Sequence, residues 1–139
     1  MLEVPTKFFV TSGRAVSRVT DLNAFDKALL NAGMGEQNLV SVSSILPALV
    51  KQIPKKKMPR GAIVHCVLAQ MRGSEGETIS AGIAYAYRKD KQGGYVAEGH
   101  GHMNRKAMRE ILQWKLEEMA KLRGIELGPI KYKIEELSI

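Results

Sequence analysis

Cysteine is almost absent from this chain. Cys66 is the only one among 139 residues, so no disulfide can form within the chain, and a reducing compartment is favoured. No run approaches the roughly 18 apolar residues that a membrane-spanning helix needs. The first residues also lack the charged and apolar stretches of a signal peptide. We therefore expect a cytoplasmic protein with no membrane partner.

The composition is that of an ordinary folded domain. With 45% hydrophobic residues, the chain is neither disordered nor fibrous, and its length predicts a single domain over residues 1–139. The formal net charge of +7 leaves a nucleic-acid partner open. However, no aromatic residues interleave with the basic run Lys55–Lys57, and no DNA- or RNA-binding signature accompanies it. A basic nucleic-acid-binding domain is therefore the weaker alternative, and the role of the Lys55–Lys57 loop stays open.

Two helices are predicted from capping residues and apolar periodicity. The first begins after Thr20, a good N-cap, and ends at Gly33, which suits the left-handed position after a helix. The second is long, begins after Asn104 and stops at Gly124. Strands are predicted at 8–11, 38–46, 62–71, 77–87, 95–98 and 129–137, with a Pro- and Lys-rich connection over 48–60. This order predicts an α+β fold, in which helices pack outside antiparallel or mixed sheets.

The most informative segment is 23–47. It carries an aspartate on the predicted helix, a glycine-rich turn, an asparagine and the pair Ser43-Ser44. A Ser-Ser pair means little by itself, but the blocks 76–81 (GETISA) and 97–101 (AEGHG) accompany it. Together these blocks resemble the archaeal-type pyruvoyl-dependent arginine decarboxylases. The resemblance covers most of the chain.

The resemblance implies that the chain cleaves itself between Ser43 and Ser44. The hydroxyl of Ser44 would attack the carbonyl of Ser43, and elimination with loss of ammonia would leave a pyruvoyl cofactor at position 44. The products would be chains 1–43 and 44–139. A serine is required at 44 because its hydroxyl is both nucleophile and leaving group. Asn38 matches the family residue that supports this processing and the mature site.

The resemblance also implies decarboxylation of L-arginine to agmatine and carbon dioxide, a step of polyamine biosynthesis. Glu98 matches the family's proton donor, a role that calls for a water-poor pocket and a raised pKa. Asp26 matches the aspartate that pairs with the substrate guanidinium. Asp26 also follows Leu22 by four residues, close to the apolar stripe of the helix, where an idle carboxylate would be costly.

Members of this family fold as layered αββα sandwiches with the helices outside. They assemble as trimers or hexamers, with active sites between neighbouring subunits. Asp26 and Ser44 of one chain therefore need not serve the same pocket. Two alternatives remain at this point: a decarboxylase of another amino acid, and an uncleaved homologue without catalysis.

Other reactive side chains carry less weight. His100 and His102 have strand spacing, but without further ligands they make an incomplete zinc set, so no metal is expected. Cys66 lies in an apolar strand and is interpreted as a buried structural thiol. Trp114 on the second helix is expected to serve in packing or in a subunit contact.

Overall fold

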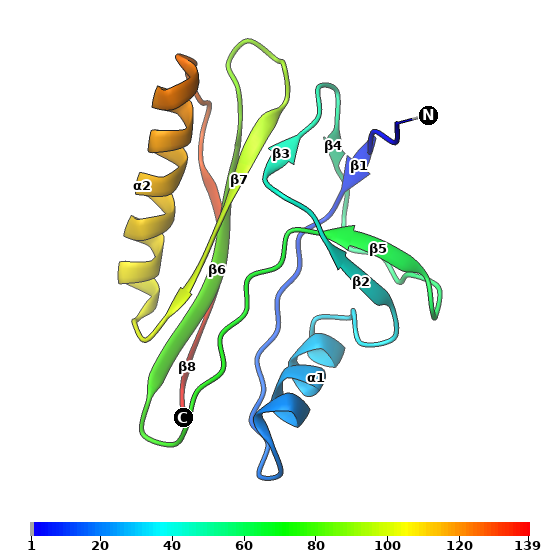
Figure 1. Ribbon diagram of the computed structural model, residues 1–139, viewed down its shortest axis with the longest axis vertical. Helices are drawn as coiled ribbons and strands as arrows, with labels where there is room; N and C mark the ends of the chain where they lie inside the picture. The colour runs from blue at the N-terminus through cyan, green and yellow to red at the C-terminus, as the bar shows by residue number, and fades with distance from the viewer. Residues whose placement is uncertain (1) are drawn as a thin grey trace.

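The computed structural model describes residues 2–139, which form a mixed α+β fold (Figure 1). Neither helix of this described part is long and apolar enough to cross a membrane. The helices are α1 (Asp21–Asn31) and α2 (Arg105–Arg123). The strands are β1 (Lys7–Phe8), β2 (Asn38–Ser41), β3 (Ile45–Leu46), β4 (Lys51–Gln52), β5 (Ile63–Cys66), β6 (Thr78–Tyr87), β7 (Gly94–Gly101) and β8 (Lys131–Ser138).

An antiparallel sheet of order β3-β7-β6-β8 forms the centre of the molecule, and α2 covers one of its faces (Figure 1). Met108, Leu112 and Leu116 of α2 are completely buried against the sheet. The small side chains of Ala84 and Ala86 on β6 let the helix approach closely. Burying each of the three large side chains contributes about 1.5–3 kcal/mol, so this contact is a main source of stability.

Both helices begin and end where their capping residues predict. The side chain of Thr20 accepts a hydrogen bond from a first-turn amide of α1 at 3.0 Å, and that of Asn104 does the same for α2 at 2.9 Å. Gly33 and Gly124 take positive φ values of 81° and 62° after the two helices. The predicted helix positions are therefore confirmed.

The opposite face of the sheet contacts the N-terminal segment 8–14. The ring of Phe8 lies edge-on to that of Tyr85, with centroids 5.9 Å apart. Further along this segment, the hydroxyl of Thr11 donates to the carbonyl of Ala32 at 2.7 Å, immediately after α1. The N-terminal segment thus lies between the sheet and α1, as Figure 1 shows.

The predicted strand 38–46 is wrong as a single element. Its first part, β2, pairs in parallel with β5 up to the register Ser41↔Cys66. Its last part, β3, pairs antiparallel with β7, with Ile45 opposite Tyr95. The chain changes its hydrogen-bonding partner in between, so the three intervening residues belong to neither strand.

Other predicted strands also differ in length. The paired part of 62–71 is only β5, and β7 extends well beyond the predicted 95–98. The connection 48–60 contains β4, which pairs in parallel with the two-residue strand β1. Local β-propensity places these segments in extended conformation, but pairing requires a neighbouring strand, which the sequence alone does not reveal.

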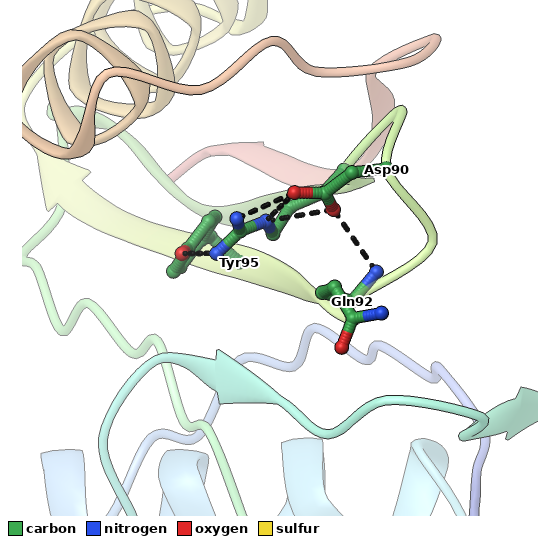
Figure 2. Close-up of polar contacts among 4 residues, drawn as sticks. Asp90, Gln92 and Tyr95 are labelled. Atoms are coloured by element: carbon green, nitrogen blue, oxygen red, sulfur yellow. Dashed lines mark hydrogen bonds and ion pairs between the residues drawn. The ribbon is translucent and has the colours of Figure 1, made fainter.

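A polar network fixes the turn between β6 and β7 (Figure 2). The guanidinium of Arg88 donates to the carboxylate of Asp90 at 2.6 Å and to the hydroxyl of Tyr95 at 3.1 Å. Asp90 also accepts the backbone N–H of Gln92 at 3.0 Å. The hydrogen bond from Arg88 is the main reason why the pKa of Asp90 lies below its usual value. The network ties the turn to the beginning of β7.

Gly93 in this turn allows β3 to approach β7. It has a φ of 88°, and an added Cβ would overlap the carbonyl oxygen of Leu46 in β3. A side chain at this position would therefore push β3 away from β7.

We predict that Gly93→Ala destabilises the chain far more than Gly76→Ala does. Gly76 has the same φ of 88°, but an added Cβ there meets nothing within 4 Å. In both variants the free energy of unfolding should fall by about 1 kcal/mol, because alanine is strained in the left-handed backbone conformation. For Gly93→Ala the free energy of unfolding should fall by at least about 2 kcal/mol more, because its Cβ clashes with the carbonyl oxygen of Leu46.

Urea unfolding of both variants, each combined with Ser44→Ala to keep one uncut chain, would measure this difference. Equal losses of unfolding free energy would contradict the proposed close approach of β3 to Gly93.

Candidate active site

Ser44 directly precedes β3, at the end of the connection from β2. Figure 1 shows this connection leading from the β2–β5 pair to β3. The carbonyl oxygen of Ser44 accepts a hydrogen bond from the N–H of Val96 at 2.9 Å, which continues the pairing of β3 with β7 by one step. Ser44 is half-buried and Ser43 is exposed. The peptide bond between the two serines lies outside both strands, so it can distort without breaking a sheet.

An open hollow of about 510 Å³ lies beside Ser44, between β7 and α2. This volume falls within the range of small-molecule sites, roughly 300–1,000 Å³. The hollow is lined by Ser44, Val96, Ala97, Glu98, Trp114, Lys115, Glu118 and Met119.

The hollow brings together Ser44 and Glu98, two of the residues selected from the sequence. Glu98 follows three buried residues of β7: Tyr95, Val96 and Ala97. Glu98 itself is exposed. The water-poor pocket expected around Glu98 is therefore not formed by this chain alone.

The structure does not bring Asp26 or Asn38 into this hollow. Asp26 is exposed on α1, and Leu22, four residues earlier, is itself 62% exposed. The expectation that Asp26 lies beside a buried apolar stripe is therefore wrong. Asn38 begins β2, and its side-chain amide donates to the carbonyl of Gly61 at 2.9 Å.

Four residues of α2 line the hollow but were not selected from the sequence as site residues: Trp114, Lys115, Glu118 and Met119. Trp114 is 62% exposed although it is the largest side chain of the helix. The ammonium of Lys115 donates to the carbonyl oxygen of Glu98 at 2.6 Å. Helical spacing places Trp114 and Glu118 on one side of α2. No pattern in the sequence indicates that this side of α2 meets the edge of β7.

The other reactive side chains lie elsewhere. His102 contacts the carboxylate of Glu77 at 2.8 Å through Nε2. Cys66 is half-buried, and burial raises the pKa of its thiol, which favours the protonated and unreactive form. Within residues 2–139, no group of three or more His, Cys, Asp or Glu side chains could hold a metal ion.

A larger hollow of about 1,160 Å³ is lined by residues of the sheet, the N-terminal segment and α1. Its lining includes Phe8, Val10, Phe25 and Leu29, but neither Ser44 nor Glu98. Ser44 and Glu98, the two candidates selected from the sequence, therefore line the smaller hollow and not the larger one.

Comparison with known proteins decides the family. Residues 7–139 match the family described as pyruvoyl-dependent arginine decarboxylase. The chain belongs to this family. The resemblance seen in the sequence blocks between residues 23 and 101 is confirmed and extends over nearly the whole chain.

Individual relatives agree with this assignment. A pyruvoyl-dependent arginine decarboxylase of Thermococcus kodakarensis is 34% identical over 137 residues, which cover 97% of this chain and 87% of the relative. One of Methanocaldococcus jannaschii is 42% identical over 118 residues, covering 81% of this chain and 69% of the relative. One of Pyrococcus abyssi is 35% identical over 123 residues, which cover 86% of this chain and 78% of the relative.

Proposed function

We propose that this chain decarboxylates L-arginine to agmatine and carbon dioxide, with a covalent pyruvoyl cofactor made from its own Ser44. One observation carries the proposal: Ser44 and Glu98, far apart in the sequence, line one hollow. Membership of the pyruvoyl-dependent arginine decarboxylase family supports both the cofactor and the substrate. The reaction would serve polyamine biosynthesis, and the single cysteine favours a cytoplasmic location.

The cofactor would arise by cleavage between Ser43 and Ser44. The Ser44 hydroxyl oxygen bonds to the Ser43 carbonyl carbon as the C–N bond breaks, which converts the amide into an ester. Elimination then releases the Ser43 carboxylate, and water replaces the nitrogen of residue 44, which leaves as ammonia. This yields chains 1–43 and 44–139. The position of this bond outside both strands supports the proposal, because attack requires a distorted peptide.

The residues around position 44 fit such a group. Cleavage leaves β3 paired with β7, so the new chain end stays beside Glu98. The carbonyl of residue 44 also survives cleavage, and the N–H of Val96 already donates to it at 2.9 Å. A fixed donor at this oxygen stabilises negative charge that develops there.

A pyruvoyl group at position 44 would supply an electron-withdrawing ketone for the decarboxylation of an amino acid. Glu98 would return a proton to the substrate carbon that lost the carboxylate. We propose that Asn38 supports processing in the hollow of a neighbouring subunit. Asn38 does not line the hollow of its own chain, and its amide donates instead to the carbonyl of Gly61.

We propose that Asp26 binds the substrate guanidinium in the hollow of a neighbouring subunit. Asp26 is exposed, and the residues four before and four after it, Leu22 and Leu30, are 62% and 49% exposed. Helical spacing places these two exposed leucines and Asp26 on one face of α1, where a neighbouring subunit could cover the leucines and receive the carboxylate.

Such contacts would build a homo-oligomer, a trimer or a hexamer. A neighbouring subunit over the hollow would also exclude water from Glu98, as its proton-donor role requires. Within each subunit, we propose that α2, the central sheet, the layer of β2 and β5 and then α1 complete an αββα sandwich.

Two substitutions test the proposed roles in the hollow. Ser44→Ala should give one uncut chain that releases no carbon dioxide from arginine. Glu98→Gln should still be cut but should turn over at least about 100-fold more slowly, because the proton donor is missing. Gel electrophoresis and carbon dioxide release would measure the two effects separately.

Glu117→Gln is the matched control, because Glu117 lies on α2 outside the hollow and bonds the side chain of Gln113. It should behave like the parent chain. A panel of other amino acids, lysine and ornithine first, tests the substrate. Normal turnover by Glu98→Gln would remove Glu98 from its role, and faster release from another amino acid would favour that alternative substrate.

A mixing experiment tests whether the site is shared between subunits. Asp26→Asn and Glu98→Gln chains should each be nearly inactive alone. Coexpressed chains should regain about a quarter of the parental activity, because each residue then comes from an intact subunit half of the time. No recovery in isolated mixed oligomers would mean that Asp26 and Glu98 act from the same chain.

A further inference from the structure

The outer edge of β7 has an unusual set of partners. β3 covers only its first two residues, Gly94 and Tyr95. In an antiparallel strand every second residue directs its N–H and C=O to the same edge, so Val96 and Glu98 come next. The N–H of Val96 donates a hydrogen bond to the Ser44 carbonyl. The carbonyl of Glu98 accepts a hydrogen bond from the ammonium of Lys115 at 2.6 Å. A side chain of α2 thus takes the place of a strand.

Lys115 is well placed to hold this edge. Its helix neighbours Leu112 and Leu116 are completely buried against the sheet, so the base of the side chain is fixed. An added Cβ at Gly99 would lie 3.8 Å from the Lys115 ammonium and 2.9 Å from the sulfur of Met108. The ammonium therefore lies beside the peptide bond between Glu98 and Gly99.

We propose that Lys115 is a positioning residue for Glu98. This inference rests on the proposed function, in which the Glu98 carboxyl must reach the substrate carbon. A charge-assisted hydrogen bond is about twice as strong as a neutral one, and here it anchors the backbone of an otherwise open strand edge. Misplacement of a reacting group by about 1 Å can cost about 100-fold in rate.

Other cations of α2 also contact the sheet, and they provide a control. The guanidinium of Arg105 donates to the carbonyl of Ile134 on β8 at 2.7 Å, at the opposite edge of the sheet. This contact has the same chemistry as that of Lys115, a helix cation on a strand carbonyl. It lies outside the hollow that contains Ser44.

The experiment compares Lys115→Met, Lys115→Arg and Arg105→Met with the parent chain. After the cleaved fraction has been measured by mass spectrometry, kcat and KM are determined per cleaved chain. Lys115→Met should be cleaved like the parent, with kcat lowered about tenfold or more and KM changed less than about threefold. Lys115→Arg keeps the charged donor, so its kcat should be much closer to that of the parent than the kcat of Lys115→Met. The kcat of Arg105→Met should stay within about twofold of the parent's.

Hydrogen exchange gives a second readout that needs no activity. In uncut Ser44→Ala chains, amides of residues 97–101 should exchange faster with Lys115→Met and at the parental rate with Arg105→Met. Unchanged exchange would overturn the anchoring of β7 by Lys115.

Two kinetic outcomes would overturn the positioning role and leave the proposed function standing. One is a kcat of Lys115→Met within twofold of an active parent, and the other is an equal loss of kcat in Arg105→Met. If the parent releases no carbon dioxide from any amino acid, the proposed function falls and the positioning role falls with it.

Discussion

The site depends on one short pairing, that of β3 with β7, and on the hydrogen bond that extends it from the N–H of Val96 to the carbonyl of Ser44. β3 has only two residues, yet it holds Ser44 in the hollow that Glu98 also lines. Gly93 leaves room for this approach, and the packing of α2 supports β7 from the side.

The change of strand partner leaves the proposed cleavage site outside both sheets. β2 ends its pairing with β5 at Ser41, and β3 begins its pairing with β7 at Ile45. The peptide bond between Ser43 and Ser44 lies between two anchored strands but in neither of them. The local charge also differs from the net charge of +7, because the hollow is lined by two carboxylates, Glu98 and Glu118, and one ammonium, Lys115. Ionic screening over about 8 Å weakens the distant positive charges.

The sequence predicted local features better than contacts. Thr20, Asn104 and Gly124 located the helix ends because capping is decided by neighbouring residues. The division of 38–46 between two sheets was missed because β-propensity does not identify a partner strand. Lys115 was missed as a site residue for a similar reason: the face of α2 that meets β7 depends on tertiary packing. Ser44 and Glu98 came from family resemblance, and their shared hollow became visible only in the fold.

The most direct test of the central claim, that Ser44 is the source of the cofactor, is an intact mass spectrum of the purified protein. The account predicts two chains, 1–43 and 44–139, with the second lighter by the mass of one ammonia than its sequence requires. A single unmodified chain of all 139 residues that persists after prolonged incubation would contradict it.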